Sequence, residues 1–143
     1  MRKLFFAALT YTVLGLLAGI YYRELTKAYD FTGDTQLSTL HTHLLALGML
    51  AFLIVLALEK VFTLSASRWF RYFFWFYNAG LLITVALMTV HGTLTVVGSA
   101  SGAAIAGIAG LGHIVITVGI AFLFACLYAR LRHTESDTGA KKN

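Results

Sequence analysis

Four long apolar runs, separated by short polar segments, divide the chain. They cover residues 4–28, 38–59, 69–91 and 103–131, and a helix of about 20 such residues crosses the hydrocarbon core of a bilayer. We therefore predict an all-α, four-span transmembrane helix bundle as one domain over residues 1–132. The polar residues 133–143 predict a disordered cytoplasmic tail.

The ends of the runs carry boundary signals. Ser38 and Thr39 are candidate N-caps of the second span. Aromatic residues cluster at 69–75, as expected for a helix that starts at the headgroup level. We expect the third span to close at His91, with a loop starting at Gly92.

Composition excludes an ordinary soluble domain. Of the 143 residues 59% are hydrophobic and 12% are charged, against about a quarter charged in globular domains, and the mean hydropathy is +0.79. The only cysteine, Cys126, lies in the last apolar run and is expected to be a buried, inert thiol. One cysteine allows neither a disulfide within the chain nor a cysteine-based metal cluster.

The net charge of +5 indicates orientation, and no nucleic-acid partner is expected. Basic residues concentrate in cytoplasmic segments, and here they flank the runs on the side of the termini and the middle loop. We therefore predict cytoplasmic termini and an uncleaved first helix. The basic residues on that side are Arg2, Lys3, Lys60, Arg68, Arg71, Arg130, Arg132, Lys141 and Lys142, which leaves Arg23 and Lys27 on the outer side.

Four histidines fall near the predicted outer face, where ionisable residues in a membrane helix suggest function. His41 and His43 open the second span, His91 closes the third, and His113 lies near the start of the fourth. Neutral imidazole is the commonest metal ligand. The four histidines therefore predict a metal or haem site, with Gly48 on nearly the same face as His41 leaving room for a ring.

The geometry of a helix leaves several arrangements open. Residues two apart point about 200° apart, so His41 and His43 serve opposite sides of their helix. Arg23 pairs either with haem propionates or with a neighbouring acid or lipid phosphate. Met88 lies one turn before His91, so a copper site with a thioether ligand is a further alternative.

The stretch from Leu40 to Gly48 resembles a signature of the haem-copper oxidase catalytic subunit, in which a histidine pair opens a membrane helix at the outer face. The chain as a whole is similar to one of that subunit's four-helix arcs, and also to small uncharacterised bacterial membrane proteins and, more distantly, to haem- and copper-containing nitric-oxide-response membrane proteins. The resemblance implies haem ligation by a bacterial inner-membrane protein. It also implies a possible homotrimer, because three arcs make up the family's subunit. Thr42 replaces the family's aromatic residue, and no His-His pair accompanies His91.

Together these observations predict a protein that binds haem b at His41, His43 and His113, with His91 as a ligand or a donor to one. Its role would be electron transfer with an unidentified redox partner, or binding of NO or O2; any enzymatic activity would be a haem-dependent oxidoreductase. Two other interpretations stay open: a haem-free copper or zinc protein, and a structural or assembly subunit in the lipid bilayer.

Overall fold

The computed structural model describes residues 1–99 and 103–140, with side chains over 1–99 and 110–132. Four helices in it are long and apolar enough to cross a membrane: Arg2–Ala28, Leu37–Phe62, Arg68–Val96 and Gly110–Arg132. No strand occurs among the described residues. The helical elements, in chain order, are α1 (Arg2–Ala28), α2 (Leu37–His43), the π-helix η1 (Leu44–Leu50), α3 (Ala51–Phe62), the 3-10 turn η2 (Leu64–Ala66), α4 (Arg68–Val96) and α5 (Ala103–Ala140).

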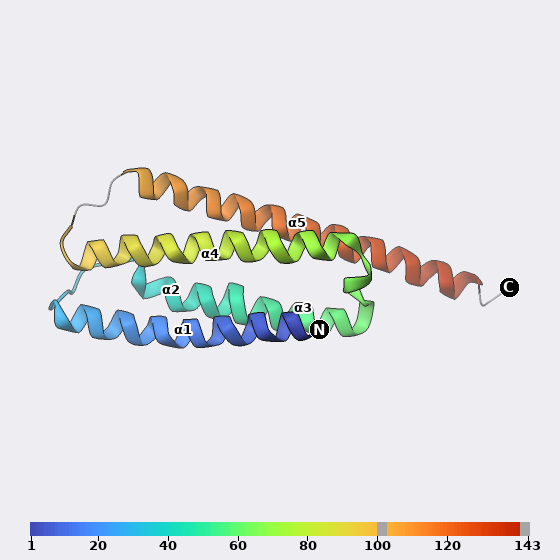
Figure 1. The fold of residues 1–143 in the computed structure, drawn as a ribbon, viewed down its shortest axis with the longest axis horizontal. Helices are drawn as coiled ribbons and strands as arrows, with labels where there is room; N and C mark the ends of the chain where they lie inside the picture. Colours follow the sequence, from blue (N-terminus) through green and yellow to red (C-terminus); the bar gives the residue numbers. More distant parts are fainter. Residues whose placement is uncertain (100–102, 141–143) are drawn as a thin grey trace.

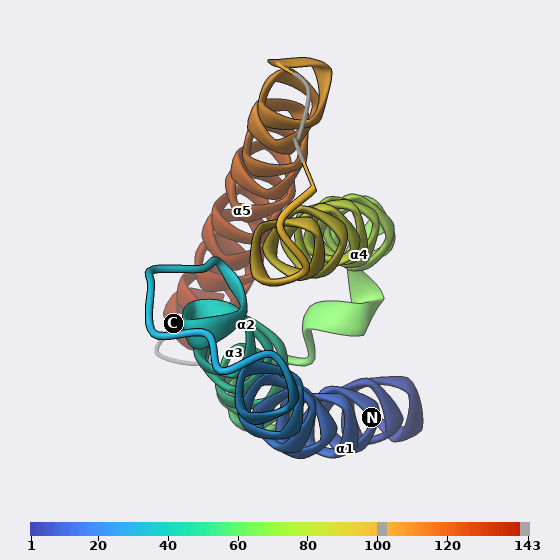
Figure 2. The same ribbon diagram turned by 90° about the vertical axis from the view of Figure 1, so that its left-hand side faces the viewer.

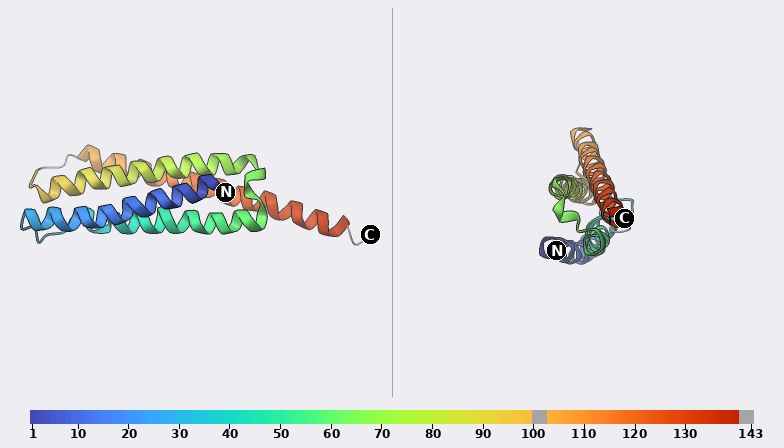
Figure 3. Two further views of the ribbon diagram at one scale, coloured as in Figure 1. Left: turned by 60° about the horizontal axis from the view of Figure 1, so that its bottom comes forward. Right: turned by 90° about the vertical axis from the view of Figure 1, so that its right-hand side faces the viewer.

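The helices run alternately up and down, as Figures 1 and 3 show. One end of the bundle holds the start of α1, the turn after α3 and the start of α4; we call it the basic end because Arg2, Lys3, Lys60 and Arg71 lie there. The opposite end, where α1 finishes and α2 begins, is called the histidine end. The C-terminal part of α5 extends beyond the other helices at the basic end.

The second membrane helix consists of α2, η1 and α3 in direct succession. The π-helical part, Leu44–Leu50, begins immediately after His43. Stretches of π-helix are rare and occur often at functional sites. The apolar pattern of residues 38–59 contains no signal for it.

Three boundaries differ from those expected. The helix α4 continues past His91 to Val96, since Gly92 packs against Leu37 and stays helical. Neither Ser38 nor Thr39 caps α2, which begins at Leu37 with no side-chain cap on its N-cap residue. The helix α5 continues through residues 133–140, where we expected disorder, and residues 141–143 lie outside the described residues.

Glycines bring the helices together in pairs. On α4 and α5, a Cβ at Gly80 would lie 2.6 Å from the backbone nitrogen of Ile116, and one at Gly119 would lie 2.8 Å from that of Tyr77. Close backbone approach at small residues is the usual way in which membrane helices pack. The outer part of α5 leans away from α2, whereas α1 lies on the other side of α2 (Figure 2).

The turn between α3 and α4 is tied to both neighbouring helices. Thr63 ends α3 in the left-handed conformation, and Glu59, which is 5% exposed, accepts hydrogen bonds from the Ser65 backbone N–H at 2.8 Å and hydroxyl at 2.6 Å. From α5, Cys126 donates its S–H to the Leu64 carbonyl oxygen at 3.4 Å. Cys126 is fully buried, which confirms the burial expected for this thiol.

Candidate functional site

His41 and His43 lie on opposite sides of α2. The Cβ of His41 is 3.9 Å from the position that a Cβ on Gly19 of α1 would take, so His41 faces α1. His43 is rotated by about 200° from it and therefore lies on the side of α2 opposite α1. Figure 2 shows α5 on that side. The two imidazoles thus have different surroundings, as the spacing predicted.

The ring of His43 is held by its own helix. Its Nδ1 lies 3.0 Å from the carbonyl oxygen of Thr39, one turn earlier. Because a carbonyl oxygen only accepts hydrogen bonds, Nδ1 carries the hydrogen of the neutral ring and Nε2 carries the lone pair. A backbone carbonyl on one ring nitrogen is the common way in which proteins orient a metal-ligating histidine. His43 therefore presents an unprotonated ring nitrogen, Nε2, away from the backbone of α2.

His91 lies on the face of α4 that contacts α5. It is seven residues after Thr84, hence on nearly the same face, and Gly112 of α5 packs against the Thr84 hydroxyl. His91 is partly buried, and its Nδ1 is buried. It is therefore placed to contact α5 or a group beside α5.

His113 follows the α4 contact of Gly112 and is exposed. It lies one position, or about 100° of helix rotation, beyond Gly112, and therefore beside the face of α5 that contacts α4. His91 and His113 thus both lie next to the contact between α4 and α5, and His43 lies on the side of α2 away from α1.

The three histidines do not share one depth. His113 is level with Thr84 through Gly112, and His91 lies about 10 Å farther along α4 at about 1.5 Å per residue. Leu37 packs against Gly92 at one level. His43 is six residues after Leu37, so it lies about 9 Å from that Leu37–Gly92 level toward the basic end. His43 and His113 are therefore closest in depth, and His91 lies nearer the histidine end.

No ready-made ion site with several protein ligands is present in the described part of the chain: no three His, Cys, Asp or Glu side chains are grouped closely enough to hold a metal ion. The buried Nδ1 of His41 has no hydrogen-bond partner there, and its Nε2 is 3.4 Å from the Thr42 hydroxyl. His41 is accordingly a second, separate imidazole on the α1 side.

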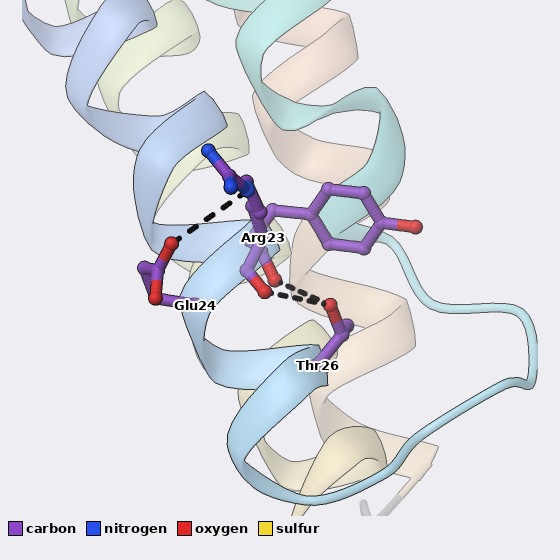
Figure 4. Close-up of polar contacts among 4 residues, drawn as sticks. Arg23, Glu24 and Thr26 are labelled. Carbon is purple, nitrogen blue, oxygen red and sulfur yellow. Dashed lines mark hydrogen bonds and ion pairs between the residues drawn. The ribbon is translucent and has the colours of Figure 1, made fainter.

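The two other expected site residues, Gly48 and Arg23, both make their contacts with residues of α1. The space beside Gly48 is filled by Tyr11, because a Cβ on Gly48 would lie 2.5 Å from that residue's Cβ. Arg23 is 78% exposed and its Nε lies 3.7 Å from Glu24 Oε1, at the histidine end of α1 (Figure 4). Thr26, one turn on, donates its hydroxyl to the backbone oxygens of Tyr22 and Arg23 (Figure 4). Neither Gly48 nor Arg23 borders the angle between α2 and α5.

Sequence reasoning missed two parts of this site. The sequence indicates Thr39 only as a candidate helix cap. Its spacing of four from His43 is, however, the spacing at which a side chain reaches back to a helix carbonyl. The π-helix η1 follows His43 directly, and no residue pattern in the sequence predicts it.

Four helices that are long and apolar enough to cross a membrane place the chain in the class of multi-pass membrane proteins. The chain belongs to a family of proteins of unknown function, DUF2871, whose model matches residues 1–130. No curated protein and no solved structure matches the chain.

Proposed function

We propose that the protein binds b-type haem between α2 and α5, with His43 and His113 as the residues that would hold its iron, for electron transfer or for binding of NO or O2. The observation that carries the proposal is the hydrogen bond from His43 Nδ1 to the Thr39 carbonyl oxygen at 3.0 Å. It leaves Nε2 as the ligating atom on the side of α2 that faces α5.

The donor set suits haem better than a bare ion. A structural zinc ion takes four protein ligands, whereas the macrocycle supplies the equatorial ligands of a haem and the protein adds only one or two. Two imidazoles at similar depth on α2 and α5 meet that need. His91, nearer the histidine end, would then orient a ligand or the edge of the ring.

The bound haem would supply one-electron or gas-binding chemistry, and the residues of the chain would set which of the two occurs. If both His43 and His113 hold the iron, electron transfer would be favoured. If His43 alone holds it, binding of a diatomic gas would be favoured. The apolar faces of α2 and α5 would exclude water from either site.

We further propose that the histidine end faces outward in a bacterial inner membrane, with the termini in the cytoplasm. The distribution of basic residues supports this orientation.

The experiment is an absorption spectrum of the detergent-purified protein with haem, oxidised and then reduced by dithionite. We expect a Soret band with sharp reduced bands, and its loss in His43→Ala and in His113→Ala. His41→Ala is the matched control because its ring faces α1, and it should keep the spectrum. Free imidazole added to His43→Ala should restore the band, which separates a lost ligand from a misfolded protein.

Two results would overturn the proposal. A colourless wild-type protein that retains stoichiometric copper or zinc by elemental analysis would favour the ion site. A colourless, metal-free protein that is unaffected by any of the substitutions would favour a structural or assembly subunit.

A further inference from the structure

A groove at the basic end separates the start of α1 from the start of α4. It comprises two adjoining hollows of about 560 Å³ each, which share Arg2, Lys3, Phe74 and Trp75 as lining residues. Figure 3 shows these two helix starts at the same end of the molecule. The haem proposal concerns the opposite end and uses none of these residues.

The mouth of the groove is positively charged. Arg2 and Lys3 of α1 and Arg71 of α4 line it, and all three are exposed. Among the described residues that line either hollow, none is Asp or Glu. Three cations without an acidic neighbour in the lining favour an anion at this position.

The floor of the groove is apolar and long. It extends along α1 from Arg2 to Leu14, thirteen residues whose ends lie about 18 Å apart along the helix. One leaflet of a bilayer contributes about 15 Å of hydrocarbon, half of the total core. The groove therefore matches the reach of a lipid acyl chain, which a small water-soluble anion would leave unfilled.

Two polar side chains of the floor, Tyr11 and Asn78, already have hydrogen-bond partners. The Tyr11 hydroxyl donates to Asn78 Oδ1 at 2.9 Å, and the Asn78 amide donates to the Phe74 carbonyl oxygen at 2.7 Å. A lipid acyl chain lying in the groove would therefore contact apolar rings and polar groups that are already hydrogen-bonded to each other. Trp75, which is 65% exposed, flanks both hollows at the level where indole rings prefer the membrane interface.

We propose that this groove binds an anionic glycerophospholipid of the leaflet at the basic end. Arg2, Lys3 and Arg71 contact its phosphate, and one acyl chain lies between α1 and α4 along the apolar floor. Basic pockets between membrane helices are a known form of lipid recognition. The chemistry selected is one phosphodiester with net negative charge, without the choline cation that would be repelled by the three basic residues.

The test is native mass spectrometry of the detergent-purified protein with equimolar phosphatidylglycerol and phosphatidylcholine. We expect the phosphatidylglycerol adduct to exceed the phosphatidylcholine adduct at least tenfold. The triple variant Arg2→Gln, Lys3→Gln, Arg71→Gln should bring the two adducts to about equal intensity. The matched control removes three other basic-end charges, Lys60→Gln, Arg68→Gln and Arg132→Gln, and should keep the preference.

A second variant tests the floor without changing charge. Ala7→Phe fills the hollow that extends to Leu14, which Ala7 lines. It should lower the phosphatidylglycerol adduct severalfold although Arg2 and Lys3 remain. Glycerol 3-phosphate at hundredfold excess should not displace the lipid. Equal adducts in the wild type, equal losses in both triple variants, or displacement by glycerol 3-phosphate would each overturn the proposal. None of these outcomes depends on haem.

Discussion

At the scale of single residues, small side chains determine how closely the helices approach. A Cβ on Gly48 would lie 2.5 Å from both the Cβ and the Cγ of Tyr11, atoms close to the backbone of α1 that cannot swing aside. The Tyr11 ring in turn stacks on Phe52, with centroids 5.7 Å apart and planes 3° from parallel. Gly48 therefore sets the distance between α1 and the π-helical segment.

Gly48→Ala is expected to destabilise the protein by about 1–3 kcal/mol, because the added methyl group overpacks this contact. Unfolding of the purified protein in a denaturing-detergent titration measures the change. Gly110→Ala is the control, since a Cβ there meets nothing within 4 Å. An equal loss of stability in both variants would mean that helix propensity, and not the Tyr11 contact, determines the effect of Gly48→Ala.

Glu59→Gln is expected to cost about 1.5–3 kcal/mol, because hydrogen bonds to a charged acceptor contribute that much. The side chain accepts two bonds from Ser65 and is almost fully buried. Glu24→Gln is the control: its pairing with Arg23 is exposed at 58% and 78%, so its stability should change by about 0.5 kcal/mol or less. A Glu59→Gln variant as stable as Glu24→Gln would show that the turn after α3 does not depend on this carboxylate.

At the scale of elements, η1 interrupts an otherwise regular membrane helix. The wider turn of a π-helix leaves backbone groups that neighbouring elements can bind. One of them is taken by α4, where the Tyr77 hydroxyl donates to the Leu47 carbonyl oxygen at 2.9 Å. The contact ties the segment that follows His43 to the centre of the bundle.

Tyr77→Phe should loosen this segment, because it removes the donor and leaves the Leu47 carbonyl with one partner fewer. We expect a loss of about 0.5–1.5 kcal/mol, typical of one neutral hydrogen bond. Hydrogen exchange of the amides in residues 44–52 should become faster to match. Tyr72→Phe, which alters an exposed ring earlier on α4, should leave these amides unchanged; equal protection in both variants would contradict the role of Tyr77.

Sequence periodicity predicted the elements that depend on hydrophobic length and missed those that depend on contacts between helices. Four apolar runs gave four spans, because a membrane crossing requires little else. The continuation of α4 beyond His91 depends on Leu37 packing against Gly92, a contact 55 positions apart in the chain. The 200° separation of His41 and His43 was predictable from helix geometry. That Tyr11 occupies the space beside Gly48 was not, because it requires the register of α1 against η1.

At the scale of the whole molecule, the two ends of the bundle differ in chemistry. The basic end carries the cation-lined groove and the turn held by Glu59. The imidazoles on α2 and α4 lie toward the histidine end, whereas His113 on α5 is level with Thr84, near the middle of α4. Basic segments stay on the cytoplasmic side during insertion. Under the proposals above, one charge distribution would orient the membrane helices and would place the lipid site in the cytoplasmic leaflet, away from the haem site.

This orientation predicts the accessibility of introduced cysteines in intact cells. In a Cys126→Ala background, Asp34→Cys lies at the histidine end and should react with a membrane-impermeant maleimide. Ala66→Cys lies in the turn at the basic end and should react only after the membrane is permeabilised. Both positions are exposed, so a difference reports the side of the membrane and not burial. Labelling of Ala66→Cys but not Asp34→Cys in intact cells would reverse the topology and would move the proposed haem site to the cytoplasmic leaflet.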